Sequence, residues 1–314
     1  METSFTRLVG CRHPLQQAAM GGVAGPELAG AVGGAGALGM LCEFDVEEPS
    51  DRMQRALRLA DGGCVGMGFF GQFVDHDLES FEAAAAKLHV VEVFWTVPDP
   101  LLVARARQAG NALAAWQVGS AAMAVAAEDA GCDFVIAQGI EAGGHVRGST
   151  PREQLLDEVL GAVSIPVVIA GGIATPADVA AMISAGAAGV RVGTAFVATH
   201  ESDAHPSYVD ALLAARSGDE TVLTQRFSVG WPDAPHRVSR SAVTTAEALE
   251  DDVVAEAGPA DARHSVPRFS ALPPSRHTRG RIEAMALYAG TGVGGVTSRY
   301  GAADLTAYLV SELD

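Results

Sequence analysis

The sequence lacks two common arrangements for a catalytic nucleophile. Its 314 residues include a single lysine, Lys87, which stands in an Ala-rich helical stretch and not at the end of a strand. This position argues against enzymes that form a Schiff base on a lysine at a strand end. No serine stands in the GxSxG pattern of the α/β-hydrolase nucleophile elbow. The chemistry is therefore expected to come from another kind of site.

Cysteine is scarce and its spacing indicates no special chemistry. The chain has no CxxC pair and no Cys/His pair at zinc-ligand spacing; its four cysteines are Cys11, Cys42, Cys64 and Cys132. We expect them to be small buried residues of the core. No pair of histidines at metal-ligand spacing is joined to a carboxylate, so the sequence predicts no catalytic metal.

Positive charge is also scarce. The chain carries 21 Lys and Arg against 38 Asp and Glu, a formal net charge of −17, and has no Lys/Arg-rich run. This balance argues against nucleic acid or an anionic membrane surface as a partner. No stretch reaches the roughly 18–20 apolar residues of a membrane span, and residues 1–14 lack the apolar core of a signal peptide. We expect a cytoplasmic protein with a small-molecule substrate; its oligomeric state is open, a homodimer being one option.

Short apolar runs alternate with Ala-rich helical stretches from Pro14 to about His200, as in repeated βα units of a buried parallel sheet. The runs are 15–19, 37–41, 65–70, 90–96, 113–118, 134–137, 167–170 and 190–192. Eight runs whose starts lie roughly 20 to 30 residues apart favour a closed α/β barrel, the (β/α)8 TIM barrel, over an open sheet. Such barrels take about 250 residues, which leaves room for an attachment.

The composition changes after His200, where Pro, Arg, His and Ser increase and no apolar run of strand length appears before Ile282. We therefore expect residues 205–281 to form a smaller, mainly helical cap inserted after strand eight. The barrel would then comprise residues 1–204 and 282–314. Three residues of the cap are candidates to line a pocket: Phe227, Trp231 and His236.

Two segments match the GxGxxG pattern of dinucleotide-binding folds. Residues 34–39 (GAGALG) follow a predicted helix and precede a strand, whereas the fingerprint works after a strand and before a helix. We interpret this copy as a tight connection. The second copy, residues 290–295 (GTGVGG), could approach a ligand as a loop.

Glycines follow the two strands that commonly hold phosphate in barrels. Residues 166–173 read PVVIAGGI and residues 189–196 read GVRVGTAF. Without a Cβ, these turns let backbone N–H groups reach an anion. The predicted phosphate cradle is Gly171, Gly172, Gly193 and Thr194; the alternative is that the glycines only permit tight turns.

The sixth strand ends in the segment FVIAQGIEAGGH, residues 134–145. His145 lies just past the strand end, on the face where barrels carry their chemistry, and an imidazole can take or share a proton near neutral pH. Glu141 is either its partner carboxylate or a loop-capping residue. Gln138 and Gln117 end two strands with amides suited to the N–C=O edge of a heteroaromatic ring, or to loop carbonyls.

These elements resemble the nitronate monooxygenase family of FMN-dependent barrel enzymes. The likeness covers nearly the whole chain, and its motifs are 17–20 (QAAM), 137–145 (AQGIEAGGH), 170–173 (AGGI), 193–196 (GTAF), 230–233 (GWPD) and 288–290 (YAG). The resemblance implies that His145 is catalytic beside the flavin. It also implies FMN contacts from Ala18, Ala19, Met20, Gln138, Gly143, Gly144, Gly171, Gly172, Gly193 and Thr194.

The implied reaction is the oxidation of alkyl nitronates by O2 to a carbonyl compound and nitrite, with FMN as the redox group. Neutral nitroalkanes would also be substrates if His145 removes their proton. The chain departs from the family at Ala19, where proline is usual, near Gly68, where asparagine is frequent, and at Thr291, where glutamine is common. These positions bear on the substrate.

Two other functions remain open at this stage. An FMN-dependent enoyl-thioester reductase, such as an enoyl-ACP reductase, would share the EAGGH loop and take hydride from NAD(P)H. A barrel that binds a flavin or a phosphorylated ligand without redox turnover would share the glycine cradle. Reduction of the flavin by NADH without oxygen would favour the reductase, and failure to bind FMN would exclude both redox functions.

Overall fold

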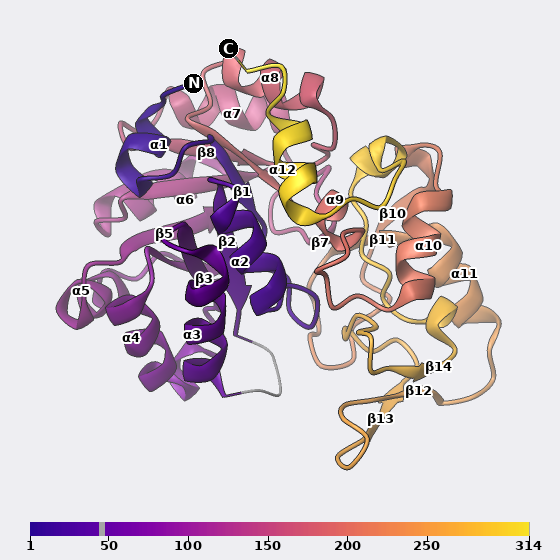
Figure 1. Cartoon of the computed structure of the whole chain (residues 1–314). Coiled ribbons are helices and arrows are strands. Elements are labelled where there is room, and N and C mark those ends of the chain that lie inside the picture. Colours follow the sequence, from indigo (N-terminus) through magenta and orange to yellow (C-terminus); the bar gives the residue numbers. More distant parts are fainter. Residues whose placement is uncertain (44–47, 314) are drawn as a thin grey trace.

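The computed structural model describes residues 1–43 and 48–313 and contains a closed barrel of eight parallel strands (Figure 1). The strands follow one another around the barrel, and β1 pairs with β9 to close it. They are β1 Leu15–Gln17, β2 Leu38–Cys42, β3 Cys64–Phe70, β4 Val90–Phe94, β5 Leu113–Val118, β6 Phe134–Gln138, β8 Val167–Ala170 and β9 Gly189–Val192. Each of the eight predicted runs overlaps one strand, and the TIM-barrel prediction is confirmed.

Helices surround the barrel between successive strands. They are α2 Pro26–Gly34, α3 Pro49–Ala60, α4 Leu78–Lys87 with the preceding 3-10 turn η1 Val74–His76, α5 Pro100–Ala109, α6 Ala121–Asp129, α7 Arg152–Leu160, α8 Pro176–Ser184, the short α9 Thr194–Val197 and the C-terminal α12 Ala302–Leu309. Helix α12 packs against α2 and α8 and so completes the ring. No helix in the described part of the chain is long and apolar enough to cross a membrane.

Helix α8 shows how local sequence sets these boundaries. Thr175 caps its N-terminus by accepting a hydrogen bond from the backbone N–H of Asp178, whose carboxylate accepts one from the Thr175 backbone N–H. Pro176 occupies the first turn, where no N–H is needed. Beyond the helix, Gly186 has φ of +103°, a conformation that glycine adopts without strain.

The connection at residues 34–39 is structural. Helix α2 ends at Gly34 and β2 begins at Leu38, so the glycines turn the chain from helix to strand, as interpreted from the sequence. Gly39 also lies so close to α2 that an added Cβ would stand 1.9 Å from the Ala29 carbonyl oxygen. The GxGxxG match therefore reflects close packing of a helix on a strand.

The four cysteines are buried, as expected. Burial raises the pKa of Cys11 and of Cys132 to about 12, and it also raises the pKa of Cys64. A thiol is nucleophilic only as the thiolate, so these three side chains are un-ionised core residues at neutral pH.

The segment 205–281 differs from expectation. It contains two helices, α10 Pro206–Ala214 and α11 Arg240–Ala248, the 3-10 turn η2 Gly218–Glu220, and five strands: β10 Thr221–Thr224, β11 His236–Ser239, β12 Val253–Ala257, β13 His264–Pro267 and β14 Arg279–Gly280. The expectation of a mainly helical cap is therefore wrong. The strands are short, β10 and β11 are half polar, and β12 has only three consecutive apolar residues, so no apolar run of strand length marks them in the sequence. The five strands pair among themselves, and β11 also pairs with β7 Gly144–His145.

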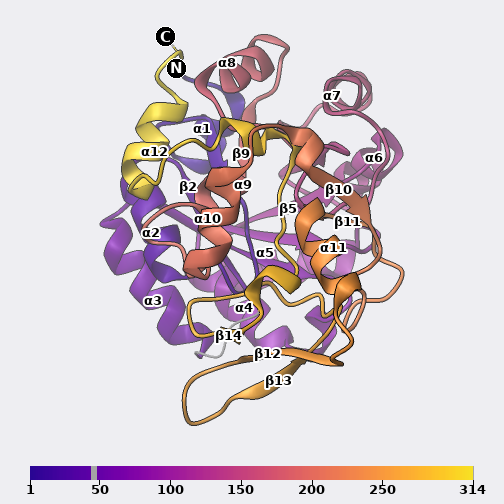
Figure 2. The same ribbon diagram turned by 90° about the vertical axis from the view of Figure 1, so that its right-hand side faces the viewer.

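The cap lies beside the barrel as a second layer, with the β12–β13–β14 sheet at its far end (Figures 1 and 2). After it the chain returns to the barrel through two 3-10 turns, η3 Ile282–Ala284 and η4 Thr291–Gly295. The strand pair β11–β7 joins the two layers, because β7 belongs to the loop after β6. The exact division into barrel and cap domains stays a prediction.

The barrel interior has an apolar end and a polar end. Helix α1 Ser4–Val9 closes the amino-terminal end, where the fully buried Phe5 ring meets Phe134 edge-on with centroids 5.4 Å apart. Toward the carboxyl ends of the strands the buried side chains become polar; these are Gln16, Glu92, Gln117, Gln138 and Arg191. The polar end is the floor of the site described below.

The apolar closure predicts that Phe5→Ala lowers the free energy of unfolding by about 3–5 kcal/mol, because it opens a void between α1 and the barrel. Urea unfolding of both proteins measures the loss. Leu8→Ala in the same helix is the matched control, since Leu8 is 36% exposed and should cost less than about 1 kcal/mol. A loss below 1 kcal/mol for Phe5→Ala would show that α1 does not seal the barrel.

Candidate functional site

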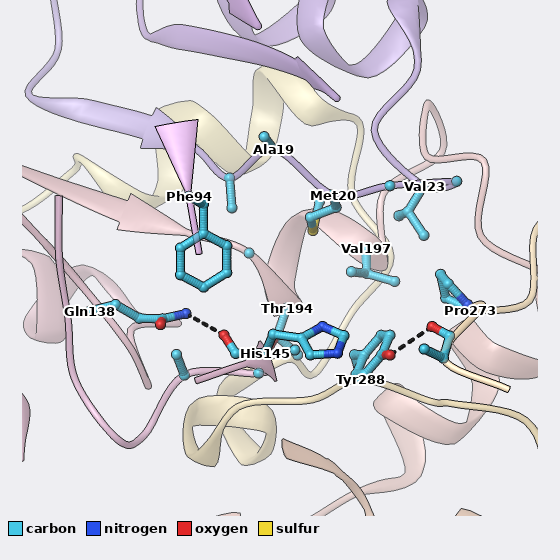
Figure 3. Close-up of a pocket in the computed structure, with 18 of the residues that line it drawn as sticks. Ala19, Met20, Val23, Phe94, Gln138, His145, Thr194, Val197, Pro273 and Tyr288 are labelled. Atoms are coloured by element: carbon cyan, nitrogen blue, oxygen red, sulfur yellow. Dashed lines mark hydrogen bonds between the residues drawn. The ribbon is translucent and has the colours of Figure 1, made fainter. Parts of the chain in front are cut away.

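A cavity of about 430 Å³ opens at the carboxyl ends of the barrel strands, between the barrel and the cap. Its wall is mostly glycine and apolar side chains, and among the described residues Arg191 is the one permanent charge that lines it. Figure 3 shows His145, Gln138 and Tyr288 on one side and Ala19, Met20 and Val23 on another. A concave, largely apolar pocket with a few polar groups is the usual form of a cofactor or substrate site.

The structure brings nearly all the predicted site residues to this cavity. The wall includes Ala18, Ala19, Met20, Gln117, Gln138, Gly143, Gly144, His145, Gly171, Gly172, Gly193 and Thr194. Gly68 does not reach it, because Ala19 covers it: an added Cβ at Gly68 would lie 2.6 Å from the Ala19 Cβ. Of the three cap candidates, Trp231 lines the cavity, whereas Phe227 and His236 lie outside its wall.

The sequence analysis did not identify Arg191 as a site residue. Arg191 lies in β9 between Val190 and Val192, whose side chains belong to the outer core under the helices. Side chains alternate along a strand, so Arg191 points into the barrel. An arginine inside a short apolar run was the sequence feature that could have identified it.

The glycines after β8 are required by the local backbone, whereas the glycine after β9 is not. Gly171 and Gly172 have φ of +115° and +65°, and an added Cβ at Gly172 would lie 2.7 Å from the Thr291 Oγ1, so both are required by the local backbone. Gly193 has an ordinary negative φ, and a Cβ there would make only ordinary contacts, 3.5 Å from the Ala18 Cβ. The missing side chain at Gly193 therefore leaves space in the cavity that the protein itself does not need.

His145 is fixed by the cap. It lies on β7, opposite His236 of β11, and its ring stacks on Trp231 with centroids 3.8 Å apart and an interplanar angle of 22°. Trp95 and Tyr288 flank the same ring at 5.8 and 5.6 Å. The imidazole is thus held in an aromatic enclosure at the edge of the cavity.

This enclosure keeps His145 neutral. Burial, and secondarily the neighbouring His236, lowers the pKa of His145 to about 3. Its Nε2 atom is itself buried and has no hydrogen-bond partner within the described residues. Glu141 does not assist it: the carboxylate accepts the backbone N–H of Arg152 at 3.0 Å, which confirms the loop-capping alternative. A buried, unpartnered ring nitrogen is available to a ligand.

His236 fixes its own position by two hydrogen bonds. Its Nδ1 lies 2.8 Å from the Ala234 carbonyl oxygen, and the Phe227 backbone N–H donates to its Nε2. These bonds require a neutral ring with the proton on Nδ1, because Nε2 must accept. Burial lowers the pKa of His236 as well, in agreement with this neutral form. His236 therefore supports β11 and the contact with His145.

Two amides present complementary groups to the cavity. Gln138 donates its side-chain N–H to the His145 carbonyl oxygen at 3.0 Å, which leaves its buried Oε1 without a described partner (Figure 3). Gln117 accepts a hydrogen bond from Arg191 at 2.6 Å, and since arginine can only donate, the amide oxygen faces the guanidinium. The amide nitrogen of Gln117 has no protein partner in the described structure. One acceptor and one donor are thus available to a heteroaromatic ring edge.

Below the cavity, the polar side chains form one connected chain. Arg191 Nη1 donates to Glu92 Oε1 at 2.7 Å, and Gln16 Nε2 donates to Glu92 Oε2 at 3.1 Å. All three residues are at most 5% exposed. Buried charges are tolerated when they are paired and hydrogen-bonded, so this chain is a fixed part of the barrel floor.

Aromatic residues cover the cavity beside His145. The Trp231 ring contacts Phe70 at a centroid distance of 4.8 Å and Trp95 at 5.3 Å, both edge-to-face. On the other side, the Tyr288 hydroxyl donates to the Ala271 carbonyl oxygen at 2.7 Å and ties the cap segment 270–273 to the wall (Figure 3). This cover excludes water from the ring nitrogen of His145 and is the physical cause of its low pKa.

The donor atoms of the cavity suit an organic ligand. Across residues 1–43 and 48–313, no three His, Cys, Asp or Glu side chains lie close enough together to hold a metal ion. The wall instead offers a glycine cradle, one amide acceptor, one amide donor and apolar surface. This combination fits a phosphorylated heteroaromatic group.

Comparison with known proteins supports the resemblance. A family model described as nitronate monooxygenase matches residues 2–62 and 75–312. A curated relative from Rhodococcus jostii, "(3aS,4S,5R,7aS)-5-hydroxy-7a-methyl-1-oxo-octahydro-1H-indene-4-carboxyl-CoA dehydrogenase", is 34% identical over 242 residues; the match covers 76% of this chain but only 65% of the relative. A "Probable nitronate monooxygenase" from Staphylococcus aureus is 28% identical over 274 residues, covering 71% of this chain and 75% of the relative.

Two solved structures match the chain over nearly its full length. FabK from Thermotoga maritima is 26% identical with a TM-score of 0.80 and covers 99% of this chain and 96% of its own. A nitroalkane oxidase from Streptomyces ansochromogenes is 29% identical with a TM-score of 0.74, covering 99% and 98%. Barrel and cap together are therefore shared with both proteins.

The low pKa of His145 predicts a dependence of stability on pH. The folded-state pKa of about 3 lies below the ordinary 6.5, so the unfolded chain binds this proton more readily once the pH falls below 6.5. The stability is complete above pH 6.5 and is lost progressively down to about pH 3. By pH 5 the loss from this ring is about 2 kcal/mol.

Urea unfolding at pH 7 and pH 5 tests this effect. His145→Gln should lose about 2 kcal/mol less than the parent between the two pH values, because glutamine takes up no proton. His277→Gln, at an exposed histidine, is the matched control and should lose as much as the parent. Equal losses in the parent and in His145→Gln would mean that the ring is not desolvated.

Proposed function

The chain belongs to the nitronate monooxygenase family and is a flavin-dependent oxidoreductase, and we propose that it binds FMN in the cavity and oxidises alkyl nitronates with O2 to a carbonyl compound and nitrite. The observation that carries this proposal is the neutral, desolvated His145 with its free Nε2 at the cavity edge. The partners would be a small nitronate and O2.

The cavity wall fits FMN on three counts. Gly171, Gly172, Gly193 and Thr194 would hold the phosphate with backbone N–H groups, at the position that barrels commonly use. The free acceptor of Gln138 and the free donor of Gln117 suit the polar edge of the flavin ring. Apolar atoms of residues 18–20 would cover its face. When bound, FMN supplies the group that accepts electrons from the substrate.

His145 would bind the substrate rather than deprotonate it. A ring whose pKa is about 3 is too weak a base to remove the proton of a neutral nitroalkane efficiently, since general bases work best with a pKa near the working pH. A neutral imidazole with its proton on Nε2 can instead donate a hydrogen bond to a nitronate oxygen. Because Trp231 excludes water, that bond is stronger than the same bond in solvent. The structure therefore favours nitronates over nitroalkanes as substrates.

The cavity also limits substrate size and charge. Flavin and substrate would share about 430 Å³, and Arg191, the one permanent charge among the described wall residues, is already paired with Glu92. No other cation is available in the wall for a large polyanion. A compact alkyl nitronate, with one delocalised negative charge and an apolar tail, matches this lining.

A second candidate is an FMN-dependent enzyme acting on an acyl thioester. The name of the Rhodococcus relative, a carboxyl-CoA dehydrogenase, favours it, since that protein is 34% identical to this chain over 242 residues. Such an enzyme would exchange hydride with a nicotinamide cofactor. Anaerobic mixing with NADH or with propyl-2-nitronate separates the two: bleaching of the flavin by nitronate alone supports the first candidate, and bleaching by NADH alone supports the second.

Gly193→Ala tests the phosphate cradle. The new methyl group would make only ordinary contacts with protein, so the stability should change by less than about 1 kcal/mol, yet it would occupy the path of the phosphate. We expect the dissociation constant for FMN to rise at least about tenfold, the loss of roughly one hydrogen bond. Quenching of FMN fluorescence on titration into apoprotein measures it.

Gly34→Ala is the matched control, because Gly34 is the last residue of α2, lies outside the cavity wall, and a Cβ there would lie 3.4 Å from its nearest neighbour. Its affinity for FMN should equal that of the parent. Unchanged affinity in Gly193→Ala would place the phosphate elsewhere in the cavity.

His145→Ala tests the substrate contact. A hydrogen bond to a charged group contributes about 1.5–3 kcal/mol, so kcat/KM for propyl-2-nitronate should fall about 10- to 150-fold while the FMN content stays the same. His145→Asn, which keeps an N–H donor, should recover part of the loss. The measurement is oxygen consumption with nitronate prepared in advance. An alanine variant as active as the parent would remove the assigned role of His145.

A further inference from the structure

Arg191 and Glu92 form an ion pair inside the barrel whose two ends have different surroundings. Arg191 lines the cavity, and so does Gln117, which accepts a hydrogen bond from the same Nη1. Glu92 and its second partner, Gln16, are absent from the cavity wall and are 2% and 0% exposed. The positive end of the pair therefore faces the cavity, and the negative end lies deeper in the barrel.

The guanidinium has one buried N–H group without a protein partner among the described residues. Its Nη1 serves both Glu92 and Gln117, at 2.7 and 2.6 Å, while its Nε is buried and has no described partner. A buried N–H without a partner is costly, and native structures rarely keep one unless a ligand or water completes it. Because the side chain is 4% exposed, its field is screened far less than that of a surface charge.

A charge in this position acts on any group that becomes negative in the cavity. Two-electron reduction of a flavin with uptake of one proton gives the ring one additional negative charge. A fixed positive charge at the floor stabilises that form relative to the oxidised form, because the charge is already in place and needs no reorganisation. The deeper Glu92 opposes this effect more weakly, since it lies behind Arg191.

We propose that Arg191 raises the reduction potential of the bound flavin. Glu92 is the counter-charge that holds Arg191 in place and partly offsets its electrostatic effect. This inference rests on the proposed binding of FMN, but not on the proposed oxidation of nitronates. It assigns to the buried ion pair a role in electron acceptance as well as a structural one.

Contact with the FMN phosphate is the competing role for Arg191. The pairing argues against it, because a phosphate at Nη1 would also meet the Glu92 carboxylate 2.7 Å away. The glycines after β8 and β9 already offer backbone N–H groups for the phosphate without Arg191. Riboflavin, which lacks the phosphate, separates the two roles in the experiment.

The experiment measures the two-electron midpoint potential of the FMN-loaded protein by anaerobic titration with dithionite and a reference dye. Arg191→Gln should lower the equilibrium constant for reduction at least tenfold, which is a fall of about 30 mV. Glu92→Gln should raise it, because Arg191 then acts without its counter-charge. Arg191→Lys keeps the charge and should stay nearer to the parent than Arg191→Gln.

Opposite shifts in the two glutamine variants are the decisive result, since loss of packing alone would not change sign with the charge that is removed. Arg191→Gln could fail to fold because it leaves Glu92 unpaired, and the double variant Glu92→Gln with Arg191→Gln then removes both charges. Its equilibrium constant for reduction should be at least tenfold below that of Glu92→Gln, which is a potential about 30 mV lower. Equilibrium constants for reduction within twofold of the parent in both variants, or shifts of the same sign, would overturn the inference.

Two further outcomes are separable. If Arg191→Gln weakens FMN binding but leaves riboflavin binding and the potential unchanged, Arg191 binds the phosphate and the inference is wrong. If the potentials shift as expected but nitronate does not reduce the flavin, the inference holds and the proposed substrate fails. A parent protein that takes up no flavin would overturn both.

Discussion

The pairing of β1 with β9 is the contact on which the site depends. It places Gln16 beside Arg191 and closes the barrel, so that the carboxyl ends of all eight strands meet at one rim. The loop after β1, with residues 18–20, then lies next to Gly193 and Thr194, although the two segments are at opposite ends of the barrel sequence. An open sheet of the same strands would leave the polar residues of β1, β4, β5 and β9 apart and without partners. Closure therefore both creates the cavity and neutralises its floor.

Exclusion of water links the cap to the chemistry. The cap contributes no charged side chain to the wall that the structure describes, yet Trp231 stacks on His145 and β11 pairs with the strand that carries it. The same desolvation lowers the pKa of His145 and strengthens a hydrogen bond from it to an anion. Both effects suit the proposed role of His145, in which a neutral ring donates a hydrogen bond to an anion and takes up no proton. The cap is thus part of the active site through its packing.

The sequence predicted the parts of the molecule that local rules determine. Apolar runs located all eight strands, and glycines located the rim of the cavity. The cap strands were missed because short, half-polar strands such as β10 and β11 form through pairing and not through an apolar pattern. The role of Trp231 depends on a stacking contact across two layers, and the covering of Gly68 by Ala19 depends on neighbouring strands. Neither can be predicted from spacing along the chain.

The division between barrel and cap also bears on substrate choice within the family. The barrel rim supplies the glycine cradle, the two amides and the ion pair, and in the proposed function these groups would face the flavin whichever substrate is oxidised or reduced. Proteins similar to this chain carry the names nitroalkane oxidase and carboxyl-CoA dehydrogenase, so the similarity alone does not distinguish a nitronate from a thioester. The surface that would distinguish them is the cap side of the cavity, formed by Trp231, the segment 270–273 and the neighbouring Tyr288. In this chain that surface is aromatic and tied down by the Tyr288–Ala271 hydrogen bond, which favours a small substrate enclosed beside His145. Specificity would then be a property of the cap, and reactivity a property of the barrel.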